Sequence, residues 1–102
     1  MKPVLVVSNR KDEQLRRALA ELLGAKITWT DNRIRKVQSV AASIASGHFS
    51  LVILITGFLQ HTTTTLVRKA ARQSATPVAL ANRGRPAAIL AAIERDTNWS
   101  SP

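Results

Sequence analysis

The run Leu51-Val52-Ile53-Leu54-Ile55, followed at once by Thr56-Gly57, decides the fold of this 102-residue chain. All positions from 51 to 55 are apolar. A short run of this kind is typical of a strand that is buried on both faces of a parallel sheet. Val4-Leu5-Val6-Val7 is a second run of the same type. The sequence therefore predicts two central strands, at residues 4 to 7 and 51 to 55.

Two weaker strands are predicted on either side of this pair. Lys26-Ile27-Thr28-Trp29-Thr30 alternates polar and apolar residues, which is typical of a half-exposed strand at a sheet edge. Residues 78 to 81 form another short apolar run, and it follows Pro77. Because proline is tolerated at the first residue of a strand, this run can be the opposite edge.

Helices are predicted between the strands, because apolar residues recur there at spacings of three and four. The first helix would bury Leu15, Ala18, Leu19 and Leu22, and Gly24 would end it. The buried faces of the other three would be Ile34, Val37, Val40, Ala41 and Ile44; Thr63, Leu66, Val67, Ala70, Ala71 and Ser74; and Ile89, Ala92 and Ile93.

Strict alternation of strands and helices predicts an α/β fold with parallel strands and right-handed crossovers. With the two apolar strands in the middle, the strand order is 2-1-3-4. We expect a Rossmann-like (flavodoxin-like) three-layer sandwich of four parallel strands and four helices. Residues 1 to 96 would form this single domain. Residues 97 to 102 would be a disordered tail, with Trp99 folding back on the domain.

The charge of the chain points to an anionic partner. Fifteen Lys and Arg residues oppose six Asp and Glu, which gives a net charge of +9. No acid lies between Asn32 and Ile93, an interval that holds eight basic residues. Such a charge favours nucleic acid or other phosphate-bearing ligands, although a basic solvated surface is the simpler interpretation. The absence of cysteine and of any apolar run near membrane-spanning length predicts a soluble cytoplasmic domain with no membrane partner.

Polar residues follow the third strand, where ligands bind in open α/β sheets. Backbone N–H groups at the start of the next helix attract anions, Gly57 permits a close approach, and threonine hydroxyls add donors. Loops after the other strands open on the same edge. The predicted phosphate or nucleic-acid site is Ser8, Asn9, Arg10, Thr56, Gly57, His61, Thr62, Thr63, Arg83 and Arg85. The alternative is that the threonines cap and pack, and that His61 is a surface or capping histidine.

Further basic residues are predicted to form a peripheral face, namely Arg33, Arg35, Lys36, Arg68, Lys69 and Arg72. Trp29 is a candidate for stacking on a base, or for packing under a helix. His48 and His61 lie far apart in sequence with no acid nearby, so no metal site is predicted. Residues 8 to 11 lack the glycine-rich turn of dinucleotide-binding folds, so no cofactor is predicted.

Residues 51 to 61 resemble the corresponding stretch of a bacterial family, the domain of unknown function 2325. The residues that carry the resemblance are Thr56-Gly57-Phe58 with His61, Trp29-x-Asp31 with Arg33, and Asn82-Arg83-Gly84. Gln60 departs from the small polar residue that the family has before its histidine. The resemblance implies a Rossmann-like fold and brings with it no established activity.

The sequence therefore predicts a regulatory binding domain that recognises nucleic acid or a nucleotide phosphate at the carboxyl ends of the strands. Small size and two sheet edges favour a homodimer. One alternative is an enzyme acting on a phosphodiester or phosphoryl group, with His61 as acid or base. Another is an assembly adaptor with an apolar contact patch and no affinity for nucleic acid.

Overall fold

The computed structural model describes residues 2 to 9, 11 to 31, 34 to 58 and 61 to 100 of the chain. Arg10, predicted at the phosphate site, and Arg33, predicted on the peripheral basic face, lie outside the described residues, as do Gln60 and the side chain of Ile34.

Four strands form one parallel sheet in the order β2-β1-β3-β4. Their bounds are β1 (Val4–Ser8), β2 (Ile27–Asp31), β3 (Leu51–Ile55) and β4 (Val78–Ala81). Every residue of β1 and β3 is buried, whereas β2 and β4 are partly exposed. The predicted strand order is confirmed, and so is the assignment of the two apolar runs to its centre.

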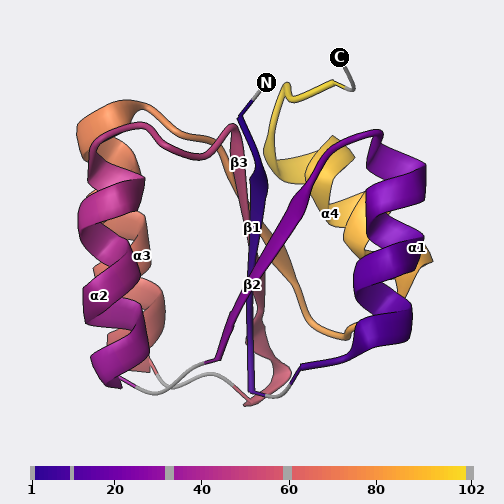
Figure 1. Cartoon of the computed structure of the whole chain (residues 1–102), viewed down its shortest axis with the longest axis horizontal. Coiled ribbons are helices and arrows are strands. Elements are labelled where there is room, and N and C mark those ends of the chain that lie inside the picture. Colours follow the sequence, from indigo (N-terminus) through magenta and orange to yellow (C-terminus); the bar gives the residue numbers. More distant parts are fainter. Residues whose placement is uncertain (1, 10, 32–33, 59–60, 101–102) are drawn as a thin grey trace.

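Helices cover both faces of the sheet (Figure 1). They are α1 (Glu13–Leu23), α2 (Ile34–Ala45), α3 (His61–Ser74) and α4 (Pro86–Asp96). A single turn of 3-10 helix, η1 (Thr56–Phe58), joins β3 to the segment before α3. Helices α1 and α4 pack on one face and α2 and α3 on the other, which confirms the predicted three-layer sandwich. No helix within the described ranges has the length and apolar character needed to cross a membrane.

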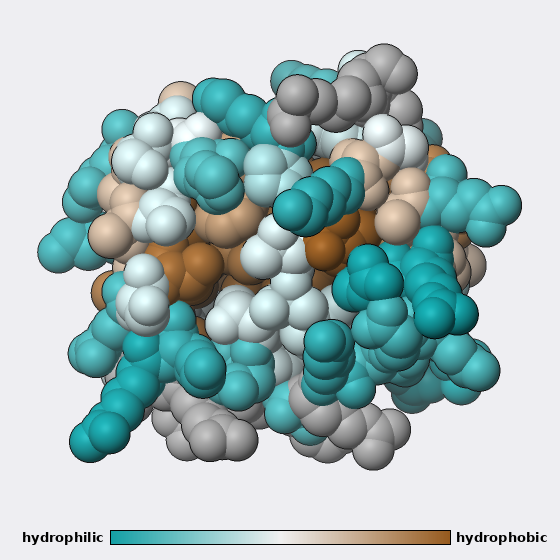
Figure 2. All heavy atoms as spheres, in the orientation of Figure 1, coloured by the Kyte–Doolittle hydropathy of each residue, from teal (hydrophilic) through white to brown (hydrophobic). Residues whose placement is uncertain are grey.

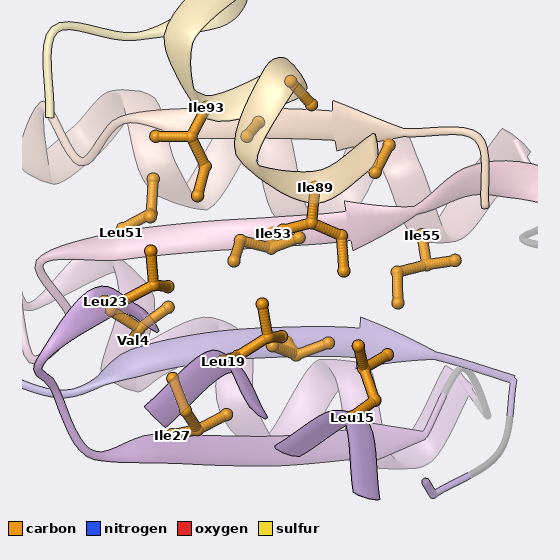
Figure 3. Close-up of a cluster of buried hydrophobic side chains, with 14 residues drawn as sticks. Val4, Leu15, Leu19, Leu23, Ile27, Leu51, Ile53, Ile55, Ile89 and Ile93 are labelled. Atoms are coloured by element: carbon orange, nitrogen blue, oxygen red, sulfur yellow. The ribbon is translucent and has the colours of Figure 1, made fainter. Parts of the chain in front are cut away.

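Alternate residues of the central strands supply two separate cores, because successive side chains of a strand point to opposite faces. Val4 and Val6 belong to the cluster beneath α1 and α4, which Figure 3 shows. Leu5 and Val7 belong to the cluster beneath α2 and α3. This double burial explains why the central strands are apolar throughout.

One prediction for α1 is wrong. Leu22 has 50% of its surface exposed, whereas Leu23 has only 2% and joins Leu15 and Leu19 in the core. Spacings of three and four are both compatible with one helix face, so the sequence did not separate the two leucines. The core does: Leu23 belongs to the same buried cluster as Ile27, the residue that begins β2 just after Gly24.

The segment after α4 is anchored to the domain as far as Trp99. The Thr97 hydroxyl donates to the Ile93 carbonyl at 2.7 Å, and the Trp99 N–H donates to the same hydroxyl at 3.1 Å. The Trp99 side chain packs against the cluster beneath α1 and α4, as the sequence analysis expected. The disordered tail predicted to begin at residue 97 stays a prediction, and residues 101 and 102 lie outside the described ranges.

Candidate functional site

A pocket of about 490 Å³ lies at the carboxyl ends of the strands, on the side of the sheet that α1 and α4 cover. Its volume falls within the range of about 300–1,000 Å³ that small-molecule sites occupy. The lining residues come from the ends of β1 and β3, from β2, from the start of α1 and from the connection between β4 and α4. They are Ser8, Asn9, Asp12, Leu15, Trp29, Ile55, Asn82, Arg83, Gly84 and Arg85.

The pocket has an apolar interior and a polar, basic rim. Leu15 and Ile55 are buried members of the core cluster, and Trp29 packs partly buried against the same cluster. Apart from Gly84, the exposed lining residues are polar, and they include two cations: Asn9, Asp12, Asn82, Arg83 and Arg85. Such a pocket is suited to a ligand that has one apolar part and one anionic part.

The beginning of α1 reaches the pocket but is already satisfied by carboxylates. Asp12 is the N-cap, and its Oδ1 accepts a hydrogen bond from the Leu15 N–H at 3.1 Å. Glu13 adds a negative charge in the first turn, where it pairs with Arg16. The hydrogen bond from Arg16 is the main cause that lowers the pKa of the Glu13 carboxyl. An anionic ligand would therefore gain little from this helix end.

The beginning of α4 is different, and it follows directly from the pocket-lining residues 82 to 85. Arg85 occupies the N-cap position and makes no side-chain capping bond, and the first turn contains no acid. Pro86, in the first turn, has no N–H to satisfy. The remaining N–H groups of this turn and the helix dipole favour a negative charge, as do the guanidinium groups of Arg83 and Arg85.

The structure brings together four of the predicted site residues, Ser8, Asn9, Arg83 and Arg85, and adds Trp29 to them. Thr56 and Gly57 do not line this pocket. The Thr56 hydroxyl donates to the Ala81 carbonyl at 3.4 Å, and a Cβ on Gly57 would lie 2.7 Å from the Asn82 carbonyl oxygen. Gly57 therefore permits the close approach of η1 to the backbone of Asn82, and these two residues support the pocket rim from behind.

The first turn of α3 lies on the other side of the sheet from the pocket. His61 and Thr62 are exposed, whereas Thr63 is buried with 1% of its surface accessible. None of the three lines the pocket. The arrangement differs here from the predicted one, in which residues 56 to 61 faced Ser8 and Asn9 across a single crevice, because α3, which begins at His61, packs on the other face of the sheet. Within the described ranges no three His, Asp or Glu side chains gather as a metal site would require.

The basic residues predicted for the peripheral face, apart from Arg33, lie on a second surface, on the α2–α3 layer, which we call the basic helical face. Its described members are all exposed, and no acid occurs in either helix: Arg35, Lys36, Arg68, Lys69 and Arg72. The sheet separates this face from Arg83 and Arg85. The predicted basic residues therefore occupy two distinct surfaces.

Five pocket residues were absent from the predicted set, namely Asp12, Leu15, Ile55, Asn82 and Gly84. Asn82 and Gly84 flank Arg83 in the turn after β4, so their position alone could have indicated them. The sequence pattern around Leu15 and Ile55 indicated only that these two residues are buried in the core. Trp29 is both a core residue and a pocket residue. Its ring packs on the core, and its buried indole N–H has no hydrogen-bond partner among the residues that the structure describes.

Comparison of the chain with protein-family models, with curated proteins and with solved structures found no match. The resemblance to the domain of unknown function 2325 family stays a prediction.

Proposed function

We propose that this chain is a binding domain for a nucleotide or a nucleic-acid phosphate, and that it acts as a homodimer. The ligand's phosphate lies against Arg83, Arg85 and the start of α4, and its apolar part enters the pocket toward Trp29, Leu15 and Ile55. The observation that carries the proposal is the joint position of Arg83 and Arg85: they line the pocket and immediately precede a helix whose first turn has neither an acid nor a side-chain cap.

The contrast between the two helix ends at the pocket supports an anionic ligand. The α1 end is occupied by Asp12 and Glu13, so its N–H groups and dipole are already compensated. The α4 end carries arginine in place of the usual Ser, Thr, Asp or Asn, and arginine has no acceptor with which to cap. A bound phosphate would supply the missing acceptor and the missing negative charge together.

The apolar interior of the pocket supports a ligand larger than inorganic phosphate. Trp29 offers an aromatic surface, and stacking of a base on an aromatic side chain contributes about 1–3 kcal/mol. Leu15 and Ile55 add apolar surface beside it. A nucleotide has this combination of an aromatic ring and a phosphate group.

Binding can be measured through the fluorescence of Trp29 in a Trp99→Phe background, which leaves Trp29 as the single tryptophan. The probes are AMP, inorganic phosphate and a single-stranded oligonucleotide with a 5′ phosphate. We expect AMP to bind more tightly than inorganic phosphate. The double variant Arg83→Ala/Arg85→Ala should weaken AMP binding at least about 100-fold, because each of the two lost hydrogen bonds to a charged group contributes about 1.5–3 kcal/mol.

A matched control removes two arginines from the basic helical face, in Arg68→Ala/Arg72→Ala. It lowers the net charge by the same amount on the other side of the sheet, so AMP affinity should change less than about twofold. Equal losses in the two double variants would contradict a local phosphate site. Absence of binding for all three probes at low salt would reject the proposed function.

The oligonucleotide distinguishes a nucleic-acid ligand from a free nucleotide. If a strand crosses several basic residues, its affinity should fall about a thousandfold or more between 50 and 200 mM salt, because each neutralised phosphate releases counterions. A small slope with salt, similar to that of AMP, would identify a mononucleotide as the ligand.

A further inference from the structure

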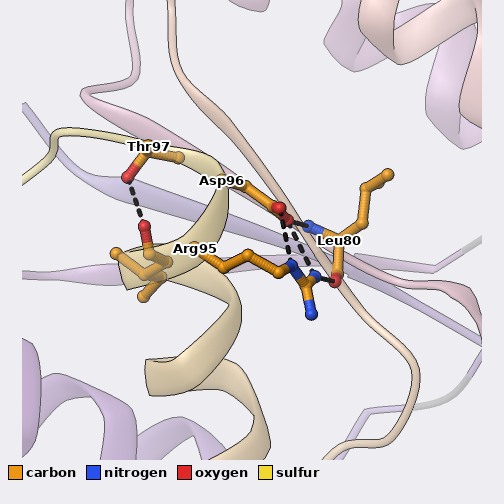
Figure 4. Close-up of polar contacts among 5 residues, drawn as sticks. Leu80, Arg95, Asp96 and Thr97 are labelled. Atoms are coloured by element: carbon orange, nitrogen blue, oxygen red, sulfur yellow. Dashed lines mark hydrogen bonds and ion pairs between the residues drawn. The ribbon is translucent and has the colours of Figure 1, made fainter.

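The two edges of the sheet differ in whether side chains bond to the outward backbone groups of the edge strand. At the β4 edge, Pro77 accepts from Val52, and since alternate residues bond to the same neighbour, the backbone groups of Leu80 point outward. Both are occupied: the Leu80 N–H donates to Asp96 Oδ2 at 2.8 Å, and Arg95 donates to the Leu80 carbonyl at 2.7 Å (Figure 4). Side chains from the end of α4 thus block the pairing of another strand with Leu80 at this edge.

The β2 edge has no such closure. The Val4 N–H donates to the Lys26 carbonyl at 2.8 Å, so Thr28 and Thr30 bond to β1 and the backbone groups of Ile27 and Trp29 point away from it. No side chain in the described part of the protein caps the Ile27 or Trp29 backbone. Figure 1 shows β2 in front of the other strands with no element across it. An edge with unpaired backbone groups is a template for pairing with another chain.

We propose that two copies of this chain join by antiparallel pairing of their β2 strands, centred on Trp29, into one continuous sheet. The inference rests on the homodimer of the proposed function, but it requires no ligand. In an antiparallel pair about a two-fold axis perpendicular to the sheet, corresponding faces of the two sheets lie on the same side. Each residue must therefore pair with a residue whose side chain points to the same face.

The register centred on Trp29 meets this requirement and uses the outward backbone groups. Trp29 pairs with its own copy, and Thr28 lies opposite Thr30 on both sides of the axis. Aromatic pairs and threonine pairs are favourable across strands, at about 0.2–1 kcal/mol each.

Two further observations favour a second copy as the occupant of this edge. Figure 2, in the same orientation as Figure 1, shows hydrophobic atoms on both sides of the near-neutral strip in the middle of the face that β2 crosses, and a symmetric partner would cover both. The closed β4 edge also stops growth, because a dimer joined through β2 presents Arg95 and Asp96 at both of its ends. The pairing therefore produces a closed dimer and not a filament.

The register can be tested with two double variants that differ in a single charge sign. Thr28→Lys/Thr30→Lys places lysines opposite one another twice, whereas Thr28→Glu/Thr30→Lys places glutamate opposite lysine twice. Sedimentation velocity over a dilution series should show a dimer for the parent and for the Glu/Lys variant. The Lys/Lys variant should dissociate at least about tenfold more readily, because like charges directly opposite one another are destabilising.

Two controls keep the result specific. Ala87→Lys/Ala91→Lys adds the same charge at exposed positions of α4 and should leave the dimer intact. In the unmodified chain, hydrogen exchange of the Trp29 amide should slow as concentration rises, whereas the Thr28 and Thr30 amides stay protected throughout by β1. A parent that is monomeric at every concentration, or a Trp29 amide that exchanges equally fast at all of them, would overturn the proposal.

A dimer that the Lys/Lys variant does not weaken would place the interface elsewhere and also overturn it. Ligand binding is measured separately by the Trp29 fluorescence of dilute protein, so failure of the β2 interface and failure of the phosphate site are distinguishable.

Discussion

The Leu80 amide and the Asp96 carboxylate are joined by a hydrogen bond of 2.8 Å, which satisfies the outward N–H of an edge strand from the last residue of the following helix. Arg95 completes the arrangement, since it bonds to both the Leu80 carbonyl and the Asp96 carboxylate. Two consecutive side chains thus replace the backbone of a neighbouring strand at this position. While these two side chains occupy the backbone groups of Leu80, the sheet can be extended only at the β2 edge.

Removing the carboxylate should open the second edge. In Asp96→Ala the Leu80 N–H is freed and Arg95 keeps only its bond to the Leu80 carbonyl, so the β4 edge becomes more available for pairing while the β2 edge remains available. We expect assemblies larger than a dimer, visible as light scattering that rises with protein concentration. Glu13→Ala is the control, because it breaks an exposed ion pair with Arg16 within α1 that does not involve the backbone of a strand. Scattering that is equal in the two variants would contradict this function of Asp96.

The same contact should make stability depend on acid pH. The hydrogen bond from Arg95, followed by that from the Leu80 N–H, lowers the pKa of the Asp96 carboxyl below its ordinary value. A carboxyl whose pKa is lower in the folded state stabilises the fold above its unfolded pKa, and this stabilisation is lost as pH falls through the folded value. The difference in Tm between the parent and Asp96→Asn should therefore be largest near neutral pH. It should shrink below about pH 4. A difference that is constant down to the acid limit of folding would contradict the lowered pKa.

The fold could be predicted from the sequence because the central strands are buried on both faces, and double burial leaves an uninterrupted apolar run such as residues 51 to 55. The side of the sheet on which the pocket opens could not be predicted. It depends on how η1 packs against the turn after β4, a contact between Gly57 and Asn82 that joins residues far apart in the chain. Glycine after a strand indicates either a close ligand or a close backbone, and the sequence does not distinguish them.

Two glycine variants distinguish a glycine that allows a close backbone contact from a glycine that lines the ligand pocket. Gly57→Ala places a methyl group 2.7 Å from the Asn82 carbonyl oxygen, so η1 or the pocket rim must shift, at a cost of about 1–3 kcal/mol. Gly84→Ala meets only the Leu15 and Ile55 side chains, at 3.4 and 3.6 Å, which is ordinary contact. We expect urea denaturation to show lower stability for Gly57→Ala and little change for Gly84→Ala.

Gly84→Ala should affect ligand affinity although it has little effect on stability. Gly84 lines the pocket, so the added methyl group narrows it and should weaken AMP binding even though the protein stays stable. If Gly84→Ala binds AMP as well as the parent does, the ligand does not enter the space beside Leu15 and Ile55.

The two adjacent leucines at the end of α1 test how far helical spacing alone determines burial. Leu23 belongs to the core with 2% of its surface exposed, and Leu22 has 50% exposed, although both continue the spacing set by Leu15 and Leu19. Leu23→Ala should lower the free energy of unfolding by about 2–5 kcal/mol, because it removes buried atoms and leaves a cavity beside Ile27 and Val4. Leu22→Ala should change it by less than about 0.5–1 kcal/mol, since a half-exposed side chain loses little burial. Urea denaturation of both variants, compared with the same m-value, measures the difference in the free energy of unfolding directly. Equal losses would mean that α1 is rotated about its axis relative to the arrangement described here.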